Sequence, residues 1–298
     1  MQTADILKKA TTERSDPSPK FIIRVSPIAW NSSDYFSANY GGFEMKVGLY
    51  GFGRAGRAVA THLLLSKDAN LCWVIRKSSI LQHRSVPEFL GIEHGEPGLI
   101  FPKDEMSPRQ LFDKHPVDVI IDFSSAEAIL SYGMEAARQG IAVVSAISAY
   151  PKEIIDFLKT LSRETRVLWS PNITIGINFL ILAAKILKTI APYTDVEIIE
   201  EHFKNKSGVS GTAIKITEAL SLDETTIKSV RAGGIVGRHE IIFGFPFQTV
   251  RLIHESISRE AFGNGALFAA QRLMERGKGF YTMEDLLIPY FSFGESMR

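Results

Sequence analysis

The densest group of chemically active side chains lies between Glu200 and Ala213. Within it His202 and Lys206 stand four residues apart, and Ser210-Gly211-Thr212 directly precedes a helix-like run. An imidazole and an ammonium group can supply or relay a proton, and the N–H groups at the start of a helix can bind a carboxylate. This segment therefore predicts a small anionic substrate that gains a hydride on one atom and a proton on another. A polar loop with only a structural role is the alternative.

A second group of residues could bind a dinucleotide. The run Gly51-Phe52-Gly53-Arg54-Ala55-Gly56 has the spacing G-x-G-x-x-G, follows a strand-like run and opens a helix-like one. In that context Gly51 permits a tight turn, Gly53 lets a pyrophosphate approach the backbone, and Gly56 permits close packing of helix on strand. We expect these six residues to bind a nicotinamide dinucleotide; a glycine-rich turn that binds nothing is the alternative.

The end of the next strand indicates which dinucleotide is preferred. Sites that prefer NAD usually carry Asp or Glu about 20 residues after the glycine motif. The run Val74–Ser79 has no acid and contains Arg76 and Lys77 instead, and arginine can bind a phosphate in a forked geometry. We predict that NADPH is preferred, with NADH as a second donor; a solvated strand end is the alternative.

Strand-like and helix-like segments alternate from Met45 to Trp169. Strands are expected at 46–50, 71–75, 117–123, 141–146 and 166–169, and helices at 55–66, 107–114, 125–139 and 150–162. A polar stretch with Pro87 and Pro102 follows the second strand. This alternation predicts an α/β domain of the Rossmann type, with a parallel sheet covered on both faces.

The order of elements changes beyond Pro171. A long helix is expected at 176–191, then strands at 196–200, 227–231, 239–243 and 249–256, and a helical tail from Glu260. The second part is therefore expected to be an α+β substrate domain with a mostly antiparallel sheet. We expect residues 45–172 to bind the dinucleotide and residues 173–259 to bind substrate and form the oligomer.

Composition excludes several classes of protein. A net charge of +1 over 298 residues, with no cluster of basic and aromatic residues, predicts neither a nucleic-acid partner nor membrane binding. The longest apolar runs are far shorter than the roughly 18 residues of a membrane span. The single cysteine, Cys72, excludes an internal disulfide and favours a reducing compartment such as the cytoplasm. The seven histidines are scattered, so no metal site is expected.

The first 44 residues have no sustained periodicity and no apolar core of signal-peptide length. We expect residues 1–44 to be a poorly ordered extension, with Met45 as the natural start.

Three further polar residues have either two possible roles or only a structural one. Asp122 could orient a ligand or cap the next helix, whereas His239 and His254 are interpreted as structural.

The region from Met45 onward resembles the 4-hydroxy-tetrahydrodipicolinate reductases (dihydrodipicolinate reductases) of lysine and diaminopimelate biosynthesis. The motifs that carry the resemblance occur in the family's order: the glycine motif, Ile121–Ser124, Ser170–Asn178, His202–Ala213, Arg231–His239 and Ser258–Ala266. The resemblance implies that NAD(P)H reduces an unsaturated, dicarboxylated cyclic imine. It also implies a homotetramer built through the second sheet, and a C-terminal helix at 260–298 that returns to the dinucleotide domain.

The resemblance also implies roles for single residues. In the family motif E-x-H-H-x-x-K-x-D-A-P-S-G-T-A, His202 corresponds to the first histidine, which is the proton donor or acceptor. Lys206 corresponds to the lysine, which is the proton donor. Ser210, Gly211 and Thr212 stand for the residues that bind a substrate carboxylate. The implied cofactor contacts are Arg76, the loop Ser145, Ala146 and Ile147, and the run Ser170, Pro171, Asn172 and Ile173.

Three departures from the family lie on the substrate side. Phe203 replaces the second histidine, a substrate-binding residue, and Ser207-Gly208-Val209 replaces the longer x-D-A-P stretch. Ser145-Ala146-Ile147-Ser148 replaces the G-T-T-G loop. Each lost hydrogen bond to a charged group should cost about 1–3 kcal/mol. Two alternatives to the pathway enzyme therefore stay open: a paralogous imine reductase with another substrate, and a non-catalytic NADPH-binding sensor.

Overall fold

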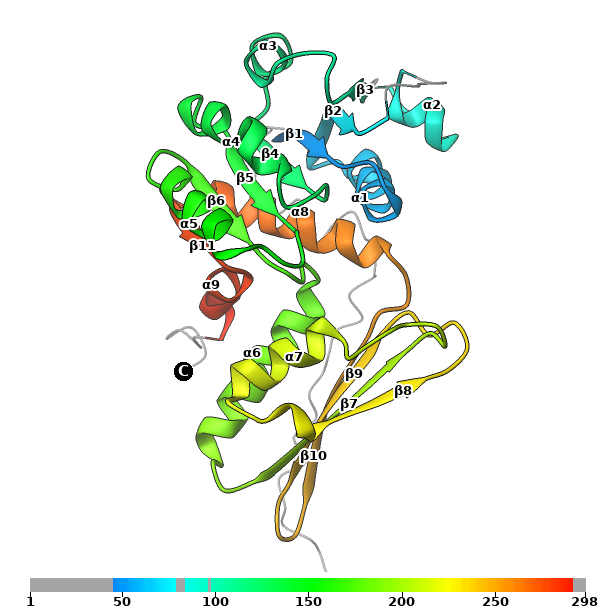
Figure 1. The fold of residues 1–298 in the computed structure, drawn as a ribbon, viewed down its shortest axis with the longest axis vertical. Helices are drawn as coiled ribbons and strands as arrows, with labels where there is room; N and C mark the ends of the chain where they lie inside the picture. Colours follow the sequence, from blue (N-terminus) through cyan, green and yellow to red (C-terminus); the bar gives the residue numbers. More distant parts are fainter. Residues whose placement is uncertain (1–44, 79–83, 96–97, 292–298) are drawn as a thin grey trace, which may run out of the picture. The chain divides into compact units, whose positions relative to one another are not determined.

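The computed structural model describes residues 45–78, 84–95 and 98–291, so the expected extension at 1–44 lies outside the described residues. The described residues form two sheets (Figure 1). One sheet is wholly parallel and covered by helices, and the other is mixed and mostly antiparallel. The predicted fold class is confirmed. None of the helices in the described part of the chain is long and apolar enough to cross a membrane.

The first sheet has seven strands in the order β11-β6-β5-β4-β1-β2-β3. β2 lies on one side of β1 and β4 on the other, so the strand order reverses between β1 and β4. In open parallel sheets, ligands bind beyond the carboxyl ends of the strands at such a reversal. The strands are β1 (Met45–Tyr50), β2 (Ala69–Arg76), β3 (Leu99–Pro102), β4 (Val119–Asp122), β5 (Ala142–Ser145), β6 (Arg166–Trp169) and β11 (Gly279–Tyr281).

Helices cover both faces of this sheet because its strands are apolar on both sides. In β1, Val47 and Leu49 belong to the core beneath one helical layer, whereas Tyr50 belongs to the core beneath the other. The first layer contains α1 (Arg54–Leu65), α8 (Glu260–Met274) and α9 (Met283–Leu287), and the second contains α3 (Pro108–Lys114), α4 (Ala128–Arg138) and α5 (Lys152–Leu161) (Figure 1). α8 lies tightly on α1, because a Cβ at Gly263 would come within 2.4 Å of the His62 side chain.

The structure differs from the sequence prediction at three short elements. The polar stretch after β2 contains the helix α2 (Val86–Leu90) and the strand β3. Pro87 lies in the first turn of α2, where its missing N–H costs nothing, and Pro102 ends β3 at the sheet edge. The tail is not helical throughout, because β11 pairs with β6 from a distant part of the chain.

The second sheet has the order β10-β9-β7-β8. Its strands are β7 (Asp195–His202), β8 (Ile227–Arg231), β9 (Arg238–Gly244) and β10 (Thr249–Glu255), and only the β7–β8 pair is parallel. The helices α6 (Ile175–Ile190) and α7 (Gly211–Leu220) form a common core with β7 and β9 (Figure 1). Two 3-10 turns, at Glu224–Thr226 and Ile288–Tyr290, complete the described elements.

The strand β7 carries the residues that become the site. Its side chains alternate, and Val196 and Ile198 point into the core formed with α6 and α7. Glu200 and His202 continue the same buried row. The row therefore changes from apolar to polar at the carboxyl end of β7, which places two titratable groups inside the domain.

Candidate active site

The sequence-predicted cofactor residues meet at the carboxyl edge of the first sheet. The loops that follow β1, β4, β5 and β6 are held side by side by backbone hydrogen bonds. The bonds run from Gly51 N to Ile75 O (2.9 Å), Phe123 N to Tyr50 O (2.8 Å), Ala146 N to Asp122 O (2.9 Å) and Ser170 N to Ser145 O (2.9 Å). The edge lies at the reversal of strand order, where a dinucleotide is expected.

The three glycines of the motif meet different surroundings. Gly51 has φ +94°, and a Cβ there would lie 2.6 Å from the backbone of Phe123. A Cβ at Gly56 would lie 2.0 Å from the carbonyl oxygen of Gly51, whereas a Cβ at Gly53 would meet no atom within 4 Å. Gly53 begins α1 without a side-chain cap, so the first N–H groups of the helix have no partner within it. This space and these donors fit a pyrophosphate.

Arg76 ends β2 and is half-buried, and Lys77 follows it in an exposed position. The Arg76 guanidinium lies 5.9 Å from the ring centroid of Phe89, which belongs to α2. Arg57, which the sequence analysis does not single out, lies 4.8 Å from the same centroid. The cationic end of β2 therefore contains one more arginine than predicted, and only the packing of α2 reveals it.

Asp122 is fully buried at the end of β4. Its carboxylate accepts hydrogen bonds from Ser124 N (2.8 Å) and the Tyr132 hydroxyl (2.7 Å), and burial raises its pKa. The interpretation of Asp122 as the cap of the next helix is wrong, because α4 begins after Glu127. Asp122 instead closes the turn that packs on Gly51.

On the second sheet, the Glu200 carboxylate has no exposed surface. It accepts hydrogen bonds from His202 Nδ1 (2.5 Å), Ser210 N (3.3 Å), Ser229 Oγ (2.6 Å) and both terminal nitrogens of Arg231 (3.0 and 2.5 Å). Burial raises its pKa, but the bonds from Arg231, Ser229 and His202 outweigh burial and lower the pKa to about 2. Glu200 is therefore ionised at neutral pH.

The state of His202 follows from that charge. An ionised carboxylate can only accept, so the hydrogen of the neutral His202 ring lies on Nδ1 and Nε2 keeps its lone pair. Burial lowers the pKa of His202 below 6.5; Glu200 opposes this shift, and Lys206 and Arg231 add to it. Beside Nε2 lies Gly237, where a Cβ would come within 3.1 Å. His202 can therefore accept a proton at neutral pH.

Lys206 lies in the turn that follows β7. Its backbone N–H donates to the Phe203 carbonyl (3.0 Å), and the residue is half-buried. Within the described ranges no ion pair involves Lys206. Phe203, in the place of the family's second histidine, leaves 44% of its surface exposed.

The start of α7 lies beside one of the predicted cofactor loops. Ser210 is the N-cap, and its hydroxyl accepts from the backbone N–H of Thr212 (3.2 Å). The Thr212 hydroxyl accepts from the side-chain amide of Asn172 (3.1 Å), and the backbone carbonyl of Asn172 accepts from the Ser170 hydroxyl (2.5 Å). Gly211 is exposed, with open space where a Cβ would be. One hydrogen-bonded path thus joins the sequence-predicted cofactor and substrate residues.

His239 belongs to the same group, although the sequence analysis interprets it as structural. Its Nε2 lies 3.0 Å from the Ser210 hydroxyl, and its ring centroid lies 5.3 Å from that of His202. Burial is the main cause that lowers the pKa of His239 to about 3, and the nearby His202 adds to it. The His239 ring is therefore neutral. The pairing of Glu200 with His239 across β7 and β9 brings it there, and no local pattern could reveal that pairing.

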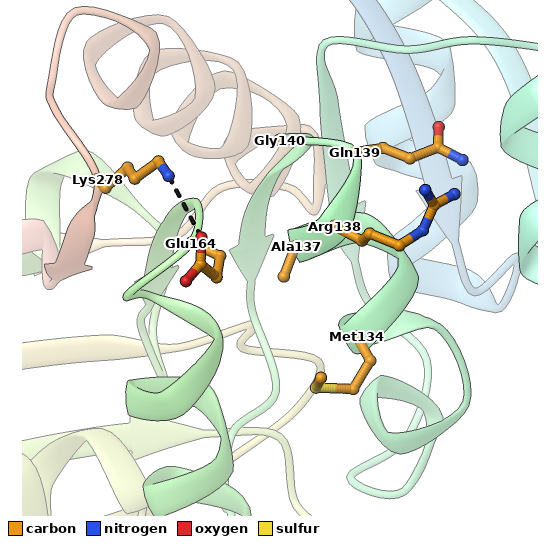
Figure 2. Close-up of a pocket in the computed structure, with 7 residues that line it drawn as sticks. All are labelled: Met134, Ala137, Arg138, Gln139, Gly140, Glu164 and Lys278. Carbon is orange, nitrogen blue, oxygen red and sulfur yellow. Dashed lines mark hydrogen bonds and ion pairs between the residues drawn. The ribbon is translucent and has the colours of Figure 1, made fainter.

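A surface hollow of about 550 Å³ lies elsewhere, between the end of α4 and the starts of β6 and β11 (Figure 2). Figure 2 shows the ion pair of Lys278 and Glu164 (3.4 Å) on its rim. The hollow is at the amino edge of the sheet, whereas dinucleotides bind at the carboxyl edge. In the described part of the chain, no three His, Cys, Asp or Glu side chains gather as a metal site would require.

Comparison with known proteins identifies the family. One family model, "Dihydrodipicolinate reductase, N-terminus", matches residues 45–173, and a second, "Dihydrodipicolinate reductase, C-terminus", matches residues 173–287. The chain belongs to the dihydrodipicolinate reductase family. It is therefore an oxidoreductase, and the resemblance inferred from the sequence is confirmed.

Curated relatives agree with this family, and a solved structure shares the fold. The chain is 36% identical over 196 residues to the 4-hydroxy-tetrahydrodipicolinate reductase of Caldanaerobacter subterraneus subsp. tengcongensis, covering 58% of this chain and 78% of the relative. It is 30% identical over 266 residues to the enzyme of that name from Staphylococcus saprophyticus, covering 81% and 100%. The dipicolinate-bound dihydrodipicolinate reductase of Paenisporosarcina sp. TG-14 has the same fold, with a TM-score of 0.69 at 21% identity, covering 82% of this chain and 99% of that one.

Proposed function

We propose that this chain uses NADPH to reduce 4-hydroxy-tetrahydrodipicolinate to tetrahydrodipicolinate in lysine and diaminopimelate biosynthesis. The observation that carries the proposal is the hydrogen bond from Asn172 to Thr212. It joins the loop beyond β6, on the cofactor side, to the helix start that follows His202 and Lys206. The names of the relatives support the choice of substrate.

His202, Lys206 and the start of α7 each have a role in this reaction. The 4-hydroxyl group of the substrate leaves as water, and a bound nicotinamide dinucleotide supplies the hydride to the unsaturated ring. The Lys206 ammonium group supplies the proton, and the neutral His202 ring can take up or relay a proton at Nε2. The run Ser210, Gly211 and Thr212 binds a substrate carboxylate at the start of α7. The Gly211 N–H and the Thr212 hydroxyl are the donors, because the Ser210 N–H donates to Glu200 and the Thr212 N–H to the Ser210 hydroxyl. Phe203 lies at the edge of this site.

The cofactor is held by residues at the carboxyl edge of the first sheet. The six residues from Gly51 to Gly56 would hold its pyrophosphate, with open space beside Gly53 to receive it. Arg76 and Lys77 bind a 2′-phosphate. The loops Ser145–Ile147 and Ser170–Ile173 lie along the same edge and contact the nicotinamide end.

Replacing Arg76 and Lys77 by alanine should reverse the cofactor preference. Each charged hydrogen bond to a phosphate is worth about 1.5–3 kcal/mol, so kcat/KM with NADPH should fall about 10- to 100-fold for each residue. The value with NADH, which lacks the phosphate, should stay within about twofold. Steady-state kinetics with both cofactors would measure this. Equal losses of kcat/KM with NADPH and NADH would show that Arg76 and Lys77 do not bind the 2′-phosphate.

The domain division follows the same reasoning. Residues 45–172 form the dinucleotide-binding domain and residues 173–259 the substrate and oligomerisation domain, and the chain from 260 returns to the first domain through α8 and β11. We further propose a homotetramer in the cytoplasm. The family resemblance supports both, and the single cysteine fits a reducing compartment.

The direct test is oxidation of NADPH at 340 nm by the purified full chain. The substrate is supplied by dihydrodipicolinate synthase with pyruvate and aspartate semialdehyde. Rapid turnover is expected. A second candidate, reduction of a less polar cyclic imine, is favoured by the exposed side chains of Phe203, Val209 and Val236 (40–44% exposed). Tight NADPH binding without turnover of the pathway substrate, together with turnover of another cyclic imine, would select that candidate.

A further inference from the structure

The Glu200 carboxylate contacts two parts of the site at once. One oxygen accepts from the ring of His202, and the other accepts from the backbone N–H of Ser210. Ser210 is the N-cap of α7. A single buried charge thus fixes both the proton-transfer ring and the helix start that is to bind a carboxylate.

Arg231 holds the same carboxylate from the neighbouring strand. It pairs with His202 in the register of β7 and β8, and its terminal nitrogens lie 3.0 and 2.5 Å from the two Glu200 oxygens. Its other donors reach the carbonyl oxygens of Lys206 (3.2 Å), Gly208 (2.7 Å) and Val230 (2.8 Å). One guanidinium group therefore ties the Lys206 loop to Glu200.

The loop needs such an anchor because it is short and open. Gly208 has φ +63°, and no atom would lie within 4 Å of a Cβ there. Ser207 and Val209 on either side are exposed, and the segment has no proline to restrict its backbone. Two hydrogen bonds from Arg231 hold the carbonyls of Lys206 and Gly208 in this loop.

We infer that Glu200 and Arg231 are positioning residues for the reaction: Glu200 orients His202 and the start of α7, and Arg231 fixes the loop that carries Lys206. The importance of these residues for turnover rests on the proposed function. The positioning itself can be observed in the protein without substrate. The two claims can therefore fail separately.

The first test follows the His202 ring by long-range ¹H–¹⁵N NMR of the full chain between pH 5 and 8. His202→Gln identifies its signals. We expect the Nδ1–H form in the wild type, and a mixture of both neutral forms in Glu200→Gln. The titration midpoint should also move to lower pH in that variant, because Glu200 raises the pKa of His202. The other charged or titratable groups around the ring, Arg231, Lys206 and His239, are unchanged.

The second test uses Arg231→Lys, which keeps the positive charge but loses the fork. Hydrogen exchange at the Lys206 and Ser210 amides should quicken about tenfold or more, since the loop loses its anchor. Arg251→Lys is the matched control, because Arg251 is an exposed arginine of the same sheet that pairs with Glu240. Its exchange at those two amides should equal that of the wild type.

Kinetics then connect positioning to catalysis. Glu200→Gln should lower kcat about 100-fold or more, because the carboxylate that fixes the neutral form of the His202 ring is lost, with the Kd for NADPH unchanged. Arg231→Lys should mainly raise the KM for the imine. An unaltered His202 ring form in Glu200→Gln, or unaltered loop exchange in Arg231→Lys, would overturn the inference. A wild type that never turns over the pathway substrate would instead reject the proposed function.

Discussion

Lys206→Ala is expected to lower kcat about 1000-fold while the Kd for NADPH stays the same. The ammonium group is the proposed proton donor, and a positioned acid or base typically contributes about 10²–10⁴-fold to a rate. Lys206 lies on the turn beyond β7 in the second sheet, whereas the glycine motif proposed to bind the dinucleotide follows β1 in the first sheet. The coupled NADPH assay measures the rate, and fluorescence titration of NADPH measures the affinity.

Lys204→Ala is the matched control for this experiment. Lys204 is an exposed lysine two residues earlier in the same turn, and it is anchored by its backbone N–H to Gly233 O (3.1 Å) rather than by its side chain. Its removal changes the net charge equally but should leave kcat within about twofold. Equal losses in both variants would mean that the turn needs positive charge in general, and Lys206 would lose its assigned role.

Gly56→Ala and Gly53→Ala should separate stability from cofactor binding. A Cβ at position 56 would lie 2.0 Å from the carbonyl oxygen of Gly51, so the turn or α1 must move. Such overpacking costs about 3 kcal/mol, or about 6–12 °C in Tm for a chain of this size. Differential scanning calorimetry would measure the change.

At position 53 the same methyl group meets no atom within 4 Å, and the backbone φ of −77° suits alanine. The free energy of unfolding should therefore change by less than about 1 kcal/mol. The methyl group would occupy the approach of the pyrophosphate, so the Kd for NADPH should rise about tenfold or more. A Gly53→Ala protein that binds NADPH normally would contradict the placement of the cofactor over α1.

The sequence could predict those parts of the fold whose signal is local. The glycine motif lies directly after a buried strand, and the strand and helix alternation up to Trp169 has the expected periods. β3 and β11 were not predicted because each is short and is stabilised by a strand elsewhere in the chain. Their existence depends on tertiary pairing rather than on a pattern in their own residues.

The same distinction applies to the site. His202 and Lys206 share one short segment, so their types and spacing indicate chemistry. His239, Ser229 and Arg231 approach Glu200 and His202 only because β8 and β9 flank β7 in one register. Arg57 joins Arg76 only through the packing of α2. Site residues that are close together in the chain can be predicted from the sequence. Strand pairing decides which residues from distant parts of the chain join the same site.

The return of the chain to its first sheet also governs the order in which the protein can fold during synthesis. α8 and β11 leave the ribosome after the whole second sheet has been made. Until then, the face of the first sheet that receives Ala266, Ala269 and Ala270 lacks that cover, and the outer edge of β6 has no partner. Incomplete chains with bare apolar faces and strand edges are prone to aggregate. The nascent first sheet thus depends on the segment from Glu260 onward to become a finished domain.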